Sequence, residues 1–243
     1  MTSGAFAWSR RAASFSAIGA IVAMLVYPGG TYRDHSTSGY EFFHNYLSDL
    51  GATIAHDGQP NRVGAALFVA SLLVLVVGMA GVLVGLGRFY SRSPNATLPV
   101  RLAILVGAFV CACFVGVAVT PENHVLSLHV LLTKLAFRAF PAVPLLLGLA
   151  ARRNPAAPTR VNVAWAAMVV LLVAYVLVLD WGPRASTPIG LVVQVTAQKI
   201  VAVGAVLLLV YQSYQAERFA DGGRPRERQL SREGDRSAVP TSD

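Results

Sequence analysis

Residues 62–87 read "RVGAALFVASLLVLVVGMAGVLVGLG", and Arg62 at the start is the one charged residue among them. At a helical rise of about 1.5 Å per residue, such a run is long enough to cross a hydrocarbon core of about 30 Å. An apolar segment of this length predicts a membrane-spanning helix. The stretch therefore places the chain among the all-α membrane proteins.

Similar apolar runs lie on both sides of this stretch. The chain has 243 residues, of which 55% are hydrophobic and 13% are charged, whereas soluble domains carry about 25% charged residues. We treat 1–214 as one transmembrane domain and the polar, arginine-rich 215–243 as a disordered cytoplasmic tail. The predicted fold is a bundle of six transmembrane helices, near 12–28, 62–87, 99–120, 124–150, 161–181 and 188–214.

The arginines predict the orientation of this bundle. By the rule that cytoplasmic loops carry the excess of Lys and Arg, both termini lie in the cytoplasm and the protein lies in the plasma membrane. The pI of about 10.0 then has a topological cause, so we expect membrane lipids and no nucleic acid as partners. One side of the bundle carries no acid and eight arginines, namely Arg10, Arg11, Arg88, Arg92, Arg101, Arg152, Arg153 and Arg160.

The first outer loop, 29–61, is rich in polar residues. Ser38 and Glu41 have the spacing of a capping box, and Gly51 suits a helix C-terminus. Between them the apolar and polar residues fall on opposite helical faces. We therefore predict a short amphipathic helix whose polar face folds over the bundle and meets the start of the fourth span. The alternative is that this face simply contacts water.

All five histidines map to the outer side of the predicted bundle. His124 and His129 are separated by about 140° around one helix, so they cannot bind one metal as an i, i+4 pair does. Together with His44 they are the candidate ligands of a zinc ion. The catalytic candidates, which would act as base or orient a ligand, are the polar residues Glu41, Ser48 and Asp49 of the predicted loop helix.

Three cations fall within the predicted spans: Lys134, Arg138 and Lys199. Each costs roughly 2.5–3.5 kcal/mol on insertion scales and needs a partner or a cavity. In one interpretation, acids at the outer helix ends reach them or the side chains extend to the interface. In the other, the cations attract anions into a water-filled vestibule that is lined by Gln194 and Gln198.

The segment "YLSDLG" at 46–51, Asn61 before the second span, and an outer histidine (His124 or His129) resemble a known family. This family consists of small bacterial and archaeal membrane proteins catalogued as domain of unknown function 998. The resemblance implies the polytopic fold and no particular activity.

A looser resemblance is to membrane hydrolases of the alkaline ceramidase type, which use a serine, an aspartate and three histidines around zinc near one membrane face. The chain has the corresponding residue types on one side, but six predicted helices rather than seven, no HxxxH pair and no histidine in the last helix. This resemblance implies zinc chemistry with Ser48, Asp49, His44, His124 and His129.

The sequence leaves three hypotheses for function. The first is a hydrolase or transferase, with or without a metal, that acts on a lipid at the outer leaflet. The second is a non-enzymatic lipid- or anion-binding protein or a transporter, which would use the cations within the spans. The third is a structural membrane protein in which the outer polar residues form a hydrogen-bonded plug.

Overall fold

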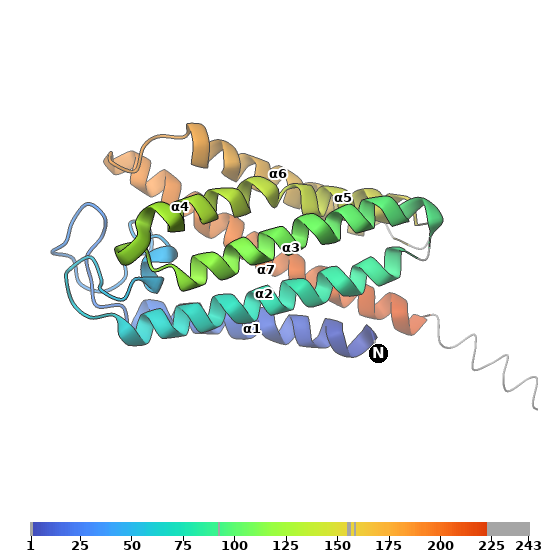
Figure 1. Ribbon diagram of the computed structural model, residues 1–243, viewed down its shortest axis with the longest axis horizontal. Coiled ribbons are helices and arrows are strands. Elements are labelled where there is room, and N and C mark those ends of the chain that lie inside the picture. Colours follow the sequence, from blue (N-terminus) through green and yellow to red (C-terminus); the bar gives the residue numbers. More distant parts are fainter. Residues whose placement is uncertain (1, 92, 155–156, 158, 223–243) are drawn as a thin grey trace, which may run out of the picture.

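The structure is a computed structural model that describes residues 2–91, 93–154, 157 and 159–222. Of the predicted tail, 215–243, residues 215–222 continue the last helix, and the rest lies outside the described residues. The described chain folds into an elongated helical bundle (Figure 1). Its helices are α1 (Thr2–Leu25), α2 (Arg62–Tyr90), α3 (Thr97–Val119), α4 (Glu122–Ala139), α5 (Ala142–Arg152), α6 (Thr159–Trp181) and α7 (Pro188–Gly222), with two short 3-10 helices, η1 (Ser48–Gly51) and η2 (Pro94–Ala96).

The helices close into a ring in chain order. Helix α1 packs against α2 and α7, α3 packs against α2, α4 and α5, and α6 packs against α5 and α7. The start of α1 and the described end of α7 lie at one end of the bundle, and the loop between α1 and α2 lies at the other (Figure 1). Arg10 of α1 forms an ion pair with Glu217 of α7 at 2.6 Å. This contact lies outside both predicted spans, so each helix extends beyond its apolar run.

Among the described residues, five helical segments are long and apolar enough to cross a membrane, and α1 is not one of them. The predicted second, third, fifth and sixth spans each correspond to one of these segments. The predicted fourth span, 124–150, is divided into α4 and α5. Pro141 stands at the break, where its missing N–H and its ring interrupt the helical hydrogen bonds. The five segments are Arg62–Tyr90, Pro94–Val119, Glu122–Arg152, Thr159–Trp181 and Pro188–Arg218.

Small residues allow α1 and α2 to pack closely. A Cβ atom added to Gly85 would lie 2.7 Å from the ring of Phe6, and one added to Gly78 would lie 2.9 Å from the Cβ of Ala12. Both separations are shorter than a normal carbon–carbon contact. Close packing through small residues is the usual way in which apolar helices associate in lipid.

The loop helix predicted from the Ser38–Glu41 capping box does not form, and the helical part is only η1. The hydroxyl of Tyr40 donates to the carbonyl oxygens of Asn45 and Tyr46, at 3.0 and 3.1 Å. The side-chain oxygen of Asn45 accepts from the Glu41 N–H. The backbone N–H groups of His44 and Asn45 both donate to the Glu41 carbonyl, at 3.0 and 2.8 Å. Because side chains satisfy the neighbouring backbone groups, this single turn does not continue as a helix.

The loop has a small hydrophobic core of its own, which fixes it to the bundle. Leu50 is fully buried there with Ala23, Tyr27 and Ala55, and Phe68 of α2 packs against them. The polar residues of the loop are therefore held by apolar packing on α1 and α2.

We predict that Leu50→Ala lowers the free energy of unfolding by about 2–5 kcal/mol, because it leaves a cavity in this core. Thermal unfolding of the purified protein in detergent measures the effect, and proteolysis of the loop should become faster. Phe43→Ala is the control, since the Phe43 side chain is exposed. Equal stability of the two variants would contradict the docking of the loop.

Candidate functional site

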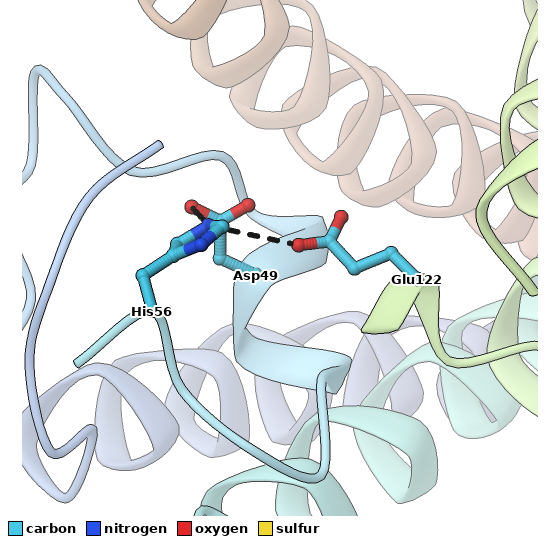
Figure 2. Close-up of side chains that lie close together, drawn as sticks. All are labelled: Asp49, His56 and Glu122. Atoms are coloured by element: carbon cyan, nitrogen blue, oxygen red, sulfur yellow. Dashed lines mark ion pairs between the residues drawn. The ribbon is translucent and has the colours of Figure 1, made fainter. Parts of the chain in front are cut away.

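Three ionisable side chains from separate segments meet at the loop end of the bundle. Asp49 comes from η1, His56 from the chain after it, and Glu122 from the first turn of α4 (Figure 2). The His56 Nε2 atom lies 3.4 Å from Asp49 Oδ2 and 3.8 Å from Glu122 Oε1. One ligand atom of each residue lies within 4.8 Å of the other two. We call these three residues the acid–imidazole cluster.

Asp49 is the most buried member of the cluster, with a side chain that is 1% exposed. Its Oδ2 atom accepts hydrogen bonds from the Asn45 side-chain amide at 3.0 Å and from the Tyr46 N–H at 2.9 Å. A buried carboxylate is stable only when donors replace its lost water. These two donors and the imidazole of His56 supply that replacement.

Asn45 connects Asp49 to the start of the loop. Its fully buried amide nitrogen donates to the Gly30 carbonyl at 2.9 Å as well as to Asp49. Gly30 has a φ of +77°, and a Cβ atom there would collide with the backbone of His56 and Asp57. Glycine is therefore required at position 30, because the segment around it passes close to the backbone of His56 and Asp57.

His56 is positioned by the backbone and by its acidic neighbours. The backbone N–H of His56 donates to the hydroxyl of Tyr27 at 3.3 Å. The hydrogen bond with Asp49 raises the pKa of His56 above its ordinary value, and this effect exceeds the opposing effect of burial. Without a bound cation, the cluster thus favours an imidazolium that faces two carboxyl groups.

Two tyrosines next to the cluster keep their protons. Burial, and then the charge of Asp49, raises the pKa of Tyr46 well above 10, and Glu122 adds to the effect. The pKa of Tyr27 is also raised, chiefly by burial. Both hydroxyls therefore remain neutral hydrogen-bond donors at the pH of a cell.

Helix α7 holds the backbone segment that precedes the cluster residue Asp49. The buried ammonium of Lys199 donates to the Asn45 carbonyl at 2.5 Å and lies 5.3 and 5.0 Å from the ring centres of Tyr40 and Phe42. The adjacent Gln198 accepts from the Leu47 N–H at 2.8 Å. Both side chains hold the backbone that precedes Asp49. Gln194, predicted to line a vestibule with Gln198, donates to the Val178 and Pro183 carbonyls.

The other two cations predicted within the spans, Arg138 and Lys134, have different partners from those of Lys199. Arg138 forms a two-point ion pair with Asp180 at 2.9 and 2.8 Å, as in the alternative in which an outer acid reaches it. Lys134 interacts with the same carboxylate at longer range. Lys134, Arg138 and Asp180 therefore form a separate electrostatic group on α4 and α6.

The three histidines predicted as metal ligands have other partners. His44 lies 3.0 Å from Glu41 in an exposed ion pair. The Nε2 atom of His124 bonds to the hydroxyl of Thr53 at 2.9 Å. The Nδ1 atom of His129 bonds to a backbone carbonyl. Of the described residues, the ones with the arrangement of a metal-ligand group are Asp49, His56 and Glu122.

Among the predicted catalytic residues, Asp49 belongs to the cluster and the Ser48 side chain lies near that of Glu122. Glu41 instead pairs with His44, away from the cluster. Sequence reasoning did not single out His56 and Glu122 as members of the candidate site. The available signal was that both are on the predicted outer side and that Glu122 begins a span, where an acid is favoured by the helix dipole.

The cluster has the donor types of a divalent-cation site. Carboxylates and a neutral imidazole bind Zn²⁺ and Mn²⁺, and three protein ligands leave further positions for water or substrate. Exposure of 25% for His56 and 15% for Glu122 leaves the cluster reachable from outside. The arrangement can therefore bind a cation and present it to a ligand from the loop side.

We predict that Asp49→Asn removes a pH-dependent part of the stability. The pKa of His56 is higher in the folded state than its ordinary value of 6.5. The His56–Asp49 interaction therefore stabilises the fold fully below pH 6.5. This contribution is lost as the pH rises through the folded-state pKa. In a chelator, the advantage of the wild type over Asp49→Asn in thermal unfolding should therefore shrink as the pH rises.

The control for that measurement is Glu41→Gln, which alters an exposed His44 pair and should change stability little at any pH. A constant difference between wild type and Asp49→Asn across the titration of His56 would contradict the interaction.

Comparison with known proteins gives a family for the chain. No curated protein and no solved structure matches the chain. The family model described as "Protein of unknown function (DUF998)" matches residues 17–211, from α1 to the inner part of α7, and so includes the whole acid–imidazole cluster. The chain is therefore a member of the DUF998 family.

Proposed function

We propose that this protein is a six-span membrane protein in which α1 also crosses the bilayer and both termini are cytoplasmic. Two observations support the proposal. The start of α1 and the end of α7 lie at one end of the bundle (Figure 1). The described arginines Arg10, Arg11, Arg88, Arg101, Arg152, Arg153 and Arg160 belong to helix ends and loops at that same end (Figure 1), as is typical of cytoplasmic segments. The acid–imidazole cluster would then face the outside of the plasma membrane.

At this outer face, the protein is a metal-dependent hydrolase or transferase that acts on a membrane lipid. The observation that carries this function is the convergence of Asp49, His56 and Glu122 within 4.8 Å. A cation such as Zn²⁺ would lower the pKa of a bound water towards 7 and polarise the carbonyl or phosphoryl oxygen of a substrate. Ser48, which precedes Asp49 in η1 and lies near Glu122, is beside these reacting groups.

A lipid substrate fits the surroundings of the cluster. The Phe42 and Phe43 rings of the loop are 49% and 54% exposed, and Trp181 at the end of α6 is 76% exposed. Aromatic rings are enriched at the level of lipid headgroups. We infer that these rings lie in the outer interface, so that headgroups reach the cluster from the bilayer and not only from bulk water.

The anion-binding or transport hypothesis has less support. Lys199 is occupied by the Asn45 carbonyl and Arg138 by Asp180. Both cations are thus engaged in holding the protein together. Cations that already have partners in the fold are poor anion sites, because an incoming anion must first displace those partners.

We predict that the full-length protein in detergent, freed of metal by a chelator, binds one Zn²⁺ or Mn²⁺ per chain. His56→Ala and Glu122→Gln should each weaken the affinity by at least about tenfold, as loss of a metal-site contact does. Isothermal titration calorimetry measures this. His44→Ala is the matched control and should bind like the wild type. Absence of binding by the wild type would refute the metal site.

We also predict that the metal-loaded protein in vesicles of phosphatidylethanolamine and phosphatidylglycerol cleaves or transfers a lipid group, detected by mass spectrometry of the lipids. Glu122→Gln should lower the rate at least about a hundredfold, since it removes a ligand and a charge at the reacting centre. Equal product formation by wild type and Glu122→Gln would separate the activity from this cluster.

A further inference from the structure

Thr53 connects the loop to the start of α4 through three hydrogen bonds. Its backbone N–H donates to the side-chain oxygen of Asn123 at 3.0 Å, and its hydroxyl accepts from the Asn123 amide nitrogen at 3.0 Å. The same hydroxyl lies 2.9 Å from Nε2 of His124. A hydroxyl that accepts one hydrogen bond still has its own proton to donate, so both bonds can form together. We call Thr53, Asn123 and His124 the latch.

On the loop side, the latch is fixed relative to two members of the acid–imidazole cluster. Thr53 lies four residues after Asp49 and three residues before His56. Its carbonyl oxygen accepts from the Asn61 N–H at 2.8 Å. The buried side-chain amide of Asn61 also donates to two carbonyls of the segment 50–52, at 3.1 and 2.9 Å. Thr53 is therefore a fixed point between the two cluster residues of the loop.

On the α4 side, the turn that carries Glu122 is partly separated from the rest of its helix. The N–H groups of His124 and Val125 both donate to the Pro121 carbonyl, at 3.0 and 3.1 Å, which closes this turn. Val125 has a φ of −138° and a ψ of 52°, so helical geometry is interrupted at the end of the turn. An interrupted helix does not by itself fix the direction of the Glu122 side chain. The latch supplies a second attachment for this turn.

Electrostatic repulsion gives the latch a task at the cluster. One carboxyl oxygen of Glu122 lies within 4.8 Å of one of Asp49. Both groups must be ionised to bind a cation, and two like charges at this distance repel each other. The latch bonds of the two residues that follow Glu122 oppose this repulsion. A site that is held in its bound geometry before the ion arrives has a higher affinity, because less order must be imposed on binding.

We propose that the latch consists of positioning residues that keep Glu122 within reach of a cation at the acid–imidazole cluster. The inference rests on the proposed metal-dependent function. Without the latch, the turn with Glu122 would occupy the binding position for only a fraction of the time, and the apparent affinity falls in proportion to that fraction. No latch residue belongs to the ligand group found among the described residues, so the latch acts through Glu122.

The test is a Zn²⁺ titration of the full-length protein in detergent, freed of metal by a chelator, in a calorimeter. Thr53→Val removes the hydroxyl at nearly constant volume, and the dissociation constant for Zn²⁺ should rise about three- to tenfold, the factor that corresponds to a hydrogen bond of ordinary strength. Thr53→Ser retains a hydroxyl and should bind like the wild type. Asn123→Ala breaks the latch from the α4 side and should weaken binding similarly, so the test does not depend on the folding of one variant.

The matched control is Thr37→Val. The Thr37 hydroxyl is buried in the same loop and has no hydrogen-bond partner among the described residues, so this variant should bind Zn²⁺ like the wild type. A double-mutant cycle then separates positioning from loop stability. If the latch acts through Glu122, Thr53→Val should cause almost no further loss of affinity in the Glu122→Gln background, because effects that pass through one group are not additive.

Three outcomes would overturn the inference. If Thr53→Val and Asn123→Ala bind like the wild type while Glu122→Gln binds more weakly, the metal site stands and the latch has no part in it. An equal loss from Thr53→Val with and without Glu122→Gln would mean that the latch only stabilises the loop. If the wild type binds no Zn²⁺, the proposed metal-dependent function fails, and the role of the latch fails with it.

Discussion

The buried carboxylate of Asp49 constrains the whole loop end of the molecule. With a side chain that is 1% exposed, it needs donors from the protein, and they come from Asn45, the Tyr46 backbone and His56. Each donor is itself fixed by another segment. Asn45 is tied to Gly30, and the His56 backbone is tied to Tyr27. The loop is therefore a cross-linked polar layer on the bundle, and its order follows from the requirement to solvate one charge.

The bundle contributes to that layer from its centre as well as from its ends. Lys199 and Gln198 of α7 hold the Asn45 carbonyl and the Leu47 N–H, so the segment before Asp49 is anchored to the last helix. Glu122 joins it to α4. A movement of α4 relative to α7 would thus change the distance between a ligand and the segment that carries Asp49. Helix packing and the geometry of the acid–imidazole cluster are therefore mechanically coupled.

The helical spans could be predicted because lipid forces backbone groups to bond within each segment, which makes apolar runs such as 62–87 unambiguous. The loop could not be predicted in the same way. Its local pattern favoured a helix from Ser38, but the deciding partner of the Asn45 carbonyl is Lys199, 154 positions along the chain. The sequence did single out Asp49. It did not indicate His56 and Glu122, because turns with positive φ at Gly30 and Gly58 bring the chain back in a way that no spacing rule describes.

The acid–imidazole cluster can hold a divalent ion in place of protons. Its two carboxyl groups stand beside one imidazole at a point where Asp49 is almost fully buried. The pair of carboxylates with a neutral imidazole would balance a dication. Binding then requires His56 to release its proton, so the interaction that raises the pKa of His56 competes with the cation. A dication and protons are thus alternative ways of compensating the charges of the cluster.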